Sequence, residues 1–213
     1  MSADPKPVLS TLHKTYPDLH HYLHFSNPLE LVMATILSAQ IRDTVVNAAT
    51  VNLFKKYKTT KDYANADVNE LIKIIQNITF AGTKAKYLKE TGKILHEKYN
   101  GQVPKTMNEL TELPGIGRKS ANAILQNAFN IVEGIVVDTH VLRVCYRLGW
   151  TTTDTNAVKS ERELMQTIPK TEWKTLPWLM KNHGRAICKA PTPFCSKCMV
   201  NKICPKQGVT KKL

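Results

Sequence analysis

Apolar residues recur at helical spacing along almost the whole chain, and polar residues that favour helix starts precede several of the apolar runs. Asn27, Pro28 and Glu30 supply a capping residue, a first-turn proline and a capping-box glutamate before the run at residues 31–37. The same pairing of a cap with a glutamate three positions later occurs at Asp67 and Glu70, before residues 71–78, and at Thr106 and Glu109, before Leu113. Further helices are predicted at residues 43–57, 83–99, 118–129, 139–148, 156–168 and 172–187, with Gly149 as a C-terminal cap.

This pattern predicts an all-α fold. The only strand-like run, at residues 135–137, follows Gly134 and is too short to build a sheet. A chain of 213 residues that is 42% hydrophobic can form one large domain or two small ones. No internal repeat and no low-complexity linker interrupt the helical pattern.

The net charge of the chain indicates what kind of molecule it binds. Thirty Lys and Arg against seventeen Asp and Glu give a formal net charge of +13, which indicates a polyanion, with nucleic acid as the leading candidate. The longest uncharged stretches, residues 31–41 and 120–132, fall short of the ~20 apolar residues that a bilayer requires. Residues 1–7 carry no hydrophobic signal segment, so we expect a cytoplasmic, nucleoid-associated protein. No heptad seam is visible, and a monomer is expected.

Four of the five cysteines lie close together near the C-terminus, with the spacing C-x6-C-x2-C-x5-C: Cys188, Cys195, Cys198 and Cys204. Because the cytosol keeps thiols reduced, these cysteines are not expected to form disulfides. Four soft sulfur ligands at this spacing indicate zinc or an iron–sulfur cluster instead. Structural zinc sites usually have two close cysteine pairs, whereas only one pair is close here. Four unrelated thiols are the remaining alternative. Cys145 stands apart in an apolar helical pattern and is expected to be a small buried hydrophobe.

A glycine-rich turn, Leu113-Pro114-Gly115-Ile116-Gly117, separates two predicted helices. Such a turn can expose backbone N–H groups at the start of the second helix, where the dipole favours an anion such as a DNA phosphate. An ordinary helical hairpin is the alternative.

Lys119 lies opposite the predicted apolar stripe of the second helix, in its first turn and next to Arg118. A lysine on a polar helix face is usually only solvated. Here the positive end of the helix dipole and Arg118 disfavour the protonated form, which would suit Lys119 to Schiff-base chemistry as a nucleophile. Asp138 comes directly before the helix predicted at residues 139–148, where a purely structural N-cap is the simplest interpretation.

Three segments together carry a family resemblance: LPGIGRKSANAIL (residues 113–125), VDTHVLRV (residues 137–144) and the four-cysteine ending. In this order they closely resemble the endonuclease III family of helix-hairpin-helix base-excision glycosylases. The resemblance extends from NPLELVMATILSAQ, residues 27–40, to Cys204.

The family resemblance implies two helical domains flanking a DNA-binding cleft. A six-helix domain with the helix-hairpin-helix would cover residues 21–134. The second domain would combine residues 1–20 with 135–213 and hold a [4Fe–4S] cluster on the loop at residues 188–204. The partner would be double-stranded DNA with damaged bases or abasic sites.

By the same resemblance Lys119 matches the nucleophile and Asp138 the catalytic carboxylate of a bifunctional enzyme. It would remove oxidised pyrimidines such as thymine glycol and cleave the abasic site by β-elimination. The residues expected to contact DNA are Gln40, Arg42, Phe80, Gly115, Gly117, Arg118, His140 and Lys189. His140 and the segment at residues 183–185 match family positions as supporting residues.

Two segments depart from the family pattern. In SAQIRDTVVN, residues 38–47, the departures are Ile41-Arg42 and Thr44-Val45. Gln40 in the same segment matches the residue that fills the gap left by a flipped base, with a solvated helix-end glutamine as the alternative. Phe80 takes the place of a leucine wedge, with a core aromatic as the alternative. Two other functions stay open: a mismatch-specific thymine or uracil DNA glycosylase of the same superfamily, and a non-catalytic DNA-binding module.

Overall fold

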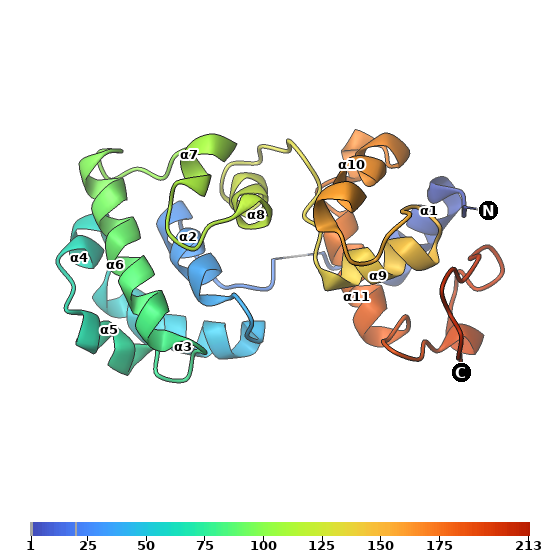
Figure 1. Ribbon diagram of the computed structural model, residues 1–213, viewed down its shortest axis with the longest axis horizontal. Helices are drawn as coiled ribbons and strands as arrows, with labels where there is room; N and C mark the ends of the chain where they lie inside the picture. The colour runs from blue at the N-terminus through green and yellow to red at the C-terminus, as the bar shows by residue number, and fades with distance from the viewer. Residues whose placement is uncertain (1, 20) are drawn as a thin grey trace. The chain divides into compact units, whose positions relative to one another are not determined.

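The computed structural model describes residues 2–19 and 21–213, and these residues form helices and connecting loops with no strand (Figure 1). The chain divides into two compact units, residues 21–131 and residues 1–20 together with 132–213. The all-α prediction is therefore confirmed. No helix of the described chain is long and apolar enough to cross a membrane.

The unit at residues 21–131 is built around one apolar helix. Its helices are α2 (Pro28–Leu37), α3 (Asp43–Lys56), α4 (Thr60–Ala64), α5 (Val68–Ile74), α6 (Ala81–Glu97), α7 (Met107–Thr111) and α8 (Arg118–Ala128). Every residue of α2 from Leu31 to Leu37 is buried, because helices pack against it from several sides (Figure 1). The C-terminal end of this buried helix leads directly to the loop that carries Gln40.

The second unit joins the N-terminal helix to the C-terminal part of the chain. It contains α1 (Pro5–Thr15), α9 (Thr139–Arg147), α10 (Ala157–Thr167) and α11 (Leu176–Ala186), with 3₁₀ turns at Lys170–Glu172 and Cys195–Lys197. Ala3 anchors the chain start, since its N–H donates to the Leu148 carbonyl at 2.9 Å and its carbonyl accepts from Trp150 Nε1 at 2.8 Å. Helices α9 and α11 pack closely and position the cysteine loop.

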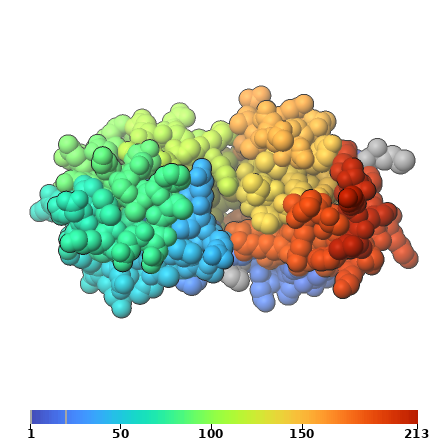
Figure 2. Space-filling view, turned by 60° about the horizontal axis from the view of Figure 1, so that its bottom comes forward, coloured from blue at the N-terminus to red at the C-terminus, as the bar shows by residue number. Residues whose placement is uncertain are grey.

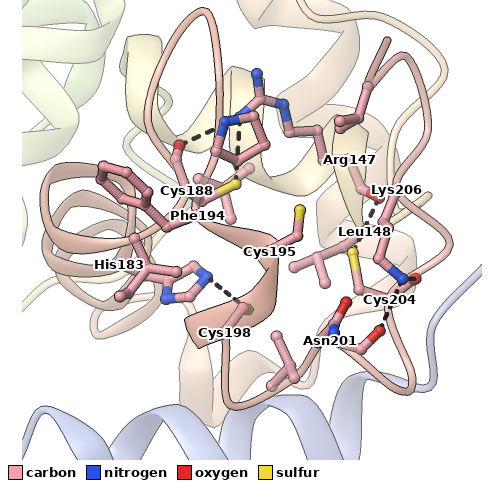
Figure 3. Close-up of a pocket in the computed structure, with 15 residues that line it drawn as sticks. Arg147, Leu148, His183, Cys188, Phe194, Cys195, Cys198, Asn201, Cys204 and Lys206 are labelled. Carbon is pink, nitrogen blue, oxygen red and sulfur yellow. Dashed lines mark hydrogen bonds between the residues drawn. The ribbon is translucent and has the colours of Figure 1, made fainter. Parts of the chain in front are cut away.

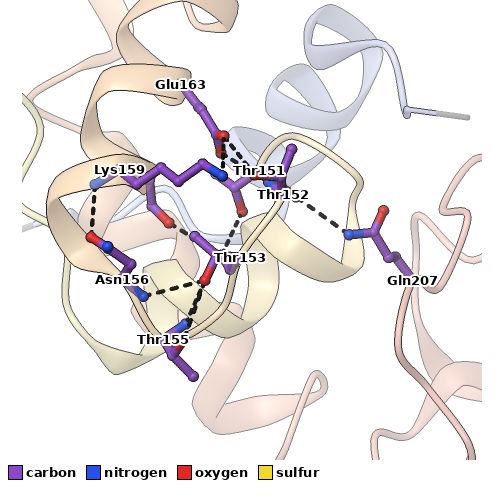
Figure 4. Close-up of polar contacts among 9 residues, drawn as sticks. Thr151, Thr152, Thr153, Thr155, Asn156, Lys159, Glu163 and Gln207 are labelled. Carbon is purple, nitrogen blue, oxygen red and sulfur yellow. Dashed lines mark hydrogen bonds and ion pairs between the residues drawn. The ribbon is translucent and has the colours of Figure 1, made fainter.

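The C-terminal segment is tied to the connection between α9 and α10. The backbone N–H of Gln207 donates to the Arg147 carbonyl at 3.1 Å, and its side-chain Nε2 donates to the Thr151 carbonyl at 3.3 Å (Figure 4). Glu163 of α10 fixes the same connection, because its carboxylate accepts from both the N–H and the hydroxyl of Thr152. The segment, red in Figure 2, thus lies on the surface of its unit beside α9.

Most predicted helix starts are correct, but several details differ. Asn27, Asp67 and Thr106 each cap a helix with the side chain as predicted. The carboxylate of Glu30, however, binds the N–H and hydroxyl of Ser26 rather than the N–H of Asn27. Glu70 likewise does not complete a capping box, because it binds Lys56 and Tyr57.

Two helix boundaries also need correction, and two helices were not predicted. The helix predicted at residues 172–187 begins at Leu176, with Pro177 in its first turn, where proline's missing N–H is tolerated. The helix predicted from Thr83 begins two residues earlier, at Ala81. Helix α1, capped by Asp4, was not predicted, and neither was α4 with its Thr59–Asp62 capping box.

Candidate active site

Asp138 is the N-cap of α9, so the predicted capping role of this residue is confirmed. Its Oδ1 accepts the backbone N–H groups of His140 and Val141, each at 2.8 Å. Both hydrogen bonds end on Oδ1, and Oδ2 accepts neither of them. One oxygen of this half-buried carboxylate therefore fixes the helix start and the orientation of the side chain.

Lys119 lies in the first turn of α8, directly after the glycine-rich turn. The turn is closed by the Ile116 N–H, which donates to the Leu113 carbonyl at 3.0 Å, and Gly115 adopts a φ of +80°. The N-cap, Gly117, has no side chain to accept the N–H groups that begin the helix. The buried face of α8 begins at Ala121, and Lys119 is exposed. Arg118 is exposed beside it.

Lys119 and Asp138 belong to different units: Lys119 to residues 21–131 and Asp138 to the other unit. Each is held by a helix start, which places both side chains on backbone that hydrogen bonding has already fixed. At the start of α8 the N-cap Gly117 makes no side-chain hydrogen bond, so an anion can bind the first backbone N–H groups. At the start of α9 the Asp138 carboxylate already binds the corresponding N–H groups.

Gln40 and Phe80 both adopt left-handed backbone conformations, with φ of 58° and 59°. The two loops are joined by a hydrogen bond from the Thr79 hydroxyl to the Gln40 carbonyl at 3.3 Å. Phe80 is 66% exposed, so the alternative that it is a core aromatic is wrong. Gln40 is also exposed, and Arg42 is exposed at the N-terminus of α3.

The remaining residues expected to contact DNA lie in the other unit. His140 is half-buried in the first turn of α9. Burial lowers its pKa, and its Nδ1 is 3.1 Å from Nη2 of Arg143. Lys189 is exposed on the cysteine loop, with its Nζ 5.1 Å from the centre of the Phe194 ring. The structure therefore brings Gln40 together with Phe80, and places His140 two residues after Asp138.

The four clustered cysteines line one small cavity in the C-terminal unit: Cys188, Cys195, Cys198 and Cys204 (Figure 3). Apolar side chains such as Val144, Leu148 and Val200 complete much of its wall. Burial raises the pKa of the Cys198 thiol to about 11 and also raises that of Cys204. Cys145 is completely buried outside this cavity, as its apolar pattern predicted.

The four clustered cysteines share one kind of donor atom around their cavity. Within the part of the chain that the structure describes, no group of three or more His, Cys, Asp or Glu side chains is arranged to hold a metal ion. The four thiols instead surround a volume. These four thiols form an all-sulfur donor set, the kind that ligates an iron–sulfur cluster.

Two buried side chains from neighbouring helices contact the clustered cysteines. Arg147 donates from Nη1 to Cys188 Sγ at 3.4 Å and to the Lys189 carbonyl at 2.8 Å, and from Nη2 to the Pro191 carbonyl at 3.1 Å. His183 has its Nε2 3.6 Å from Cys198 Sγ. Burial lowers the pKa of His183 to about 4, so the ring is neutral at pH 7.

Sequence reasoning missed Arg147, Lys84 and Tyr16 as residues that shape the site. The Tyr16 hydroxyl is 3.3 Å from His183 Nδ1, opposite the nitrogen that faces Cys198. Lys84 had a readable signal, because it falls on the buried stripe of α6 with Leu88 and Leu95. The partners of Arg147 and Tyr16 lie more than forty positions away, and local pattern carries no sign of them.

Comparison with known proteins decides the family. The model of the HhH-GPD superfamily base excision DNA repair protein matches residues 33–170. Endonuclease III of Synechocystis sp. is 39% identical over 198 residues, 93% of this chain and 90% of that protein. Endonuclease III of Bacillus subtilis is 39% identical over 203 residues, 92% of each chain.

The chain belongs to the endonuclease III family. A solved structure of a trapped endonuclease III–DNA covalent intermediate is 40% identical, with a TM-score of 0.88 and 94% of each chain covered. As a member of this family the chain is a DNA glycosylase and abasic-site lyase of base excision repair, which confirms the activity class predicted from the sequence. A thermostable thymine-DNA glycosylase, 22% identical with a TM-score of 0.82, shares the fold.

The superfamily match and the cysteine loop are separate observations. The HhH-GPD match ends at residue 170, before Cys188, so it covers Lys119 and Asp138 but not the four cysteines. For the cysteine loop of this endonuclease III family member, the relevant observation is its own geometry, in which four thiols line one cavity.

Proposed function

We propose that this chain removes oxidised pyrimidines such as thymine glycol from duplex DNA and then cleaves the abasic site through a Schiff base on Lys119. The observation that carries the proposal is the position of Lys119, exposed in the first turn of α8 directly after the Gly115–Gly117 turn. The 40% identical endonuclease III that was trapped as a covalent DNA intermediate supports a reaction that passes through a covalent enzyme–DNA bond. The proposed preference for oxidised pyrimidines rests on the presence of a lysine at position 119.

The reaction begins with an amine that must be deprotonated to attack. The Lys119 Nζ attacks C1′ of the flipped deoxynucleotide, and the N-glycosidic bond breaks with its electron pair leaving on the base. Opening of the sugar ring gives an imine between Nζ and C1′. Removal of a proton from C2′ then expels the 3′-phosphate as the C3′–O bond breaks. Water finally hydrolyses the imine and releases Lys119.

We assign Asp138 two consecutive roles in this reaction. Its carboxylate accepts a proton from Lys119 and passes it to the departing base, and the carboxylate that is thereby regained stabilises the positive charge left on the sugar. The geometry of Asp138 supports this assignment, because only Oδ1 accepts the N–H groups of His140 and Val141. A carboxylate so held needs little reorganisation when charge develops.

We propose that the DNA backbone is bound at the start of α8 and the lesion at two neighbouring loops. Gly115, Gly117 and Arg118 offer backbone N–H groups and a positive charge to a phosphate. The net charge of +13 supports strong, salt-dependent attraction to the duplex. Gln40 and Phe80, on their joined loops, are assigned to the space that the flipped nucleotide leaves.

Further phosphate contacts are proposed for Arg42, His140 and Lys189. Arg42 and Lys189 are exposed cations, and His140 lies beside the backbone that Asp138 fixes. We propose that Cys188, Cys195, Cys198 and Cys204 hold a [4Fe–4S] cluster. When bound, such a cluster supplies four metal–thiolate bonds that order the loop carrying Lys189.

Borohydride trapping tests the proposal. Duplexes carrying thymine glycol, an abasic site, a G·T or G·U mismatch, or no damage would each be incubated with wild type, Lys119→Gln and Lys93→Gln. Lys93 is an exposed lysine of α6 and serves as the matched control. We expect wild type and Lys93→Gln to be trapped on the thymine glycol and abasic duplexes, and Lys119→Gln on neither.

Other outcomes would change the assignment. Base release from mismatches without any trapped adduct would favour a monofunctional thymine or uracil glycosylase. Tight binding to every duplex with no base release and no strand cleavage would contradict a catalytic role for Lys119.

A further inference from the structure

Lys84 is the only lysine among the described residues that is buried, with 4% of its surface exposed. It extends from the second turn of α6 to the C-terminal end of α2. Its Nζ donates to the Leu37 carbonyl at 2.8 Å and to the Ala39 carbonyl at 2.7 Å. These carbonyls follow the last full turn of α2, where no backbone N–H of the helix remains to bind them.

Burying this ammonium group costs desolvation free energy, which its hydrogen bonds must offset. No carboxylate is among its hydrogen-bond partners, and burial lowers its pKa. A neutral cap or solvent could satisfy two carbonyls at a helix end at lower cost. The charged donor instead fixes the backbone at the two positions, 37 and 39, that lead to Gln40.

Gln40 has a left-handed backbone, which a side chain with a Cβ adopts only when its surroundings enforce it. Lys84 holds the carbonyl of the preceding residue, Ala39, and the Thr79 hydroxyl holds the carbonyl of Gln40 itself at 3.3 Å. Both donors come from one short segment, residues 79–84, which also contains Phe80. The segment therefore fixes the Gln40 loop relative to the exposed ring of Phe80.

We propose that Lys84, with Thr79, is a positioning residue for lesion recognition that holds Gln40 and Phe80 as one preformed element for the gap in the base stack. The proposal rests on the proposed function, which assigns those two side chains to the space of the flipped nucleotide. A Gln amide can bind the edge of an unpaired base, and an aromatic ring can insert at the adjacent step. Without the two donors the Gln40 loop would become ordered only when damaged DNA binds. That ordering would weaken binding to damaged DNA and leave binding to undamaged DNA unchanged.

Lys84→Met tests the proposal, because methionine keeps an unbranched side chain but has no donor. Lys93→Met is the matched control: it removes one exposed lysine on the opposite face of α6, two and a half turns away. Affinity would be measured for a duplex with a tetrahydrofuran abasic analogue opposite 2-aminopurine and for the undamaged duplex. The 2-aminopurine fluorescence reports whether the base opposite the lesion is unstacked.

We expect Lys84→Met to bind the tetrahydrofuran duplex about tenfold more weakly and to lose most of the fluorescence rise. Its affinity for the undamaged duplex should change by less than about twofold, because phosphate contacts are intact. Lys93→Met should keep the wild-type ratio of the two affinities. A Lys84→Met protein that is less stable but keeps the ratio and the fluorescence would overturn the proposal in favour of a purely structural cap.

Two further outcomes are distinguishable. Wild type that fails to prefer the tetrahydrofuran duplex would contradict the proposed function itself. If Lys84→Met does not fold, Thr79→Val, which removes the exposed hydroxyl, takes its place. A smaller loss of preference in the same direction supports the proposal, and an unchanged preference overturns it.

Discussion

Gly184 of α11 lies so close to His140 of α9 that a Cβ atom at position 184 would be 2.6 Å from His140 Nδ1. The same atom would be 2.9 Å from Nη2 of Arg143. That guanidinium nitrogen is 3.1 Å from both His140 Nδ1 and the Gly184 carbonyl oxygen. The missing side chain therefore lets Arg143 bridge the two helices beside the helix start that Asp138 caps.

Gly184→Ala should move His140 and Arg143 and disturb the first turn of α9. We expect the free energy of unfolding to fall by about 1–3 kcal/mol, as for other overpacked sites, and the single-turnover rate of strand cleavage to fall about tenfold or more. Denaturant unfolding and gel-based cleavage assays measure the two effects. Gly82→Ala is the stability control, because nothing lies within 4 Å of its Cβ and alanine favours the helix. Wild-type cleavage by Gly184→Ala would contradict the expectation.

Asp138 combines a helix cap with a carboxylate charge, and two substitutions separate these roles. Asp138→Asn keeps an oxygen that can accept the His140 and Val141 N–H groups, so its unfolding free energy should stay within about 0.5 kcal/mol of wild type. Asp138→Ala loses the cap and should be destabilised by about 1 kcal/mol. Both should cleave at least about a hundredfold more slowly, because neither carries the charge. Full activity in Asp138→Asn would remove the carboxylate from the mechanism.

The parts of this site that follow from sequence are those set by neighbours within three or four positions. Asn27 and Asp138 were readable as caps, since a short side chain reaches the backbone N–H groups just ahead of it. Glu30 and Glu70 were misassigned because a longer side chain reaches other partners, Ser26 in one case and Lys56 in the other.

The geometry of the functional loops depends on contacts between distant positions. The Lys84 Nζ binds carbonyls 45 and 47 positions earlier, and Arg147 binds a carbonyl 42 positions later. Hydrophobic spacing shows that these residues face inward but cannot name the oxygen atoms that they meet. The motif resemblance singled out Lys119 and the four clustered cysteines as candidates, whereas the residues that hold the loops in place could be identified only from the fold.

Arg147 is expected to hold the cysteine loop in the form that binds iron. Its guanidinium donates to the carbonyls of Cys188, Lys189 and Pro191 and to Cys188 Sγ, and Arg147→Met removes all four contacts. We expect iron to be lost to a chelator about tenfold faster, as visible absorbance and iron per chain would show. Arg162→Met, an exposed arginine of α10, is the control. Equal rates of loss in the two variants would contradict a role for Arg147 in loop order.

The capping box of α4 makes a pH-dependent contribution to stability. Asp62 Oδ2 accepts the N–H groups of Thr59 at 2.8 Å and Lys58 at 2.9 Å, while the Asp62 N–H donates to the Thr59 hydroxyl. The hydrogen bond from the Thr59 backbone, ahead of the other contributions, holds the pKa of the Asp62 carboxyl below its usual value. The folded state therefore favours the carboxylate, and the unfolded chain binds its proton at higher pH.

It follows that this stabilisation is complete above the unfolded pKa, near 4, and is lost as pH falls through the lower folded pKa. Asp62→Asn keeps an acceptor oxygen without a titrating charge. At pH 7 we expect wild type to exceed Asp62→Asn by about 0.5–1 kcal/mol in unfolding free energy, and the difference to shrink steadily between about pH 5 and pH 2. Urea unfolding at a series of pH values measures it. A difference that stays constant, or that grows as the solution becomes more acidic, would show that the charge on Asp62 does not stabilise α4.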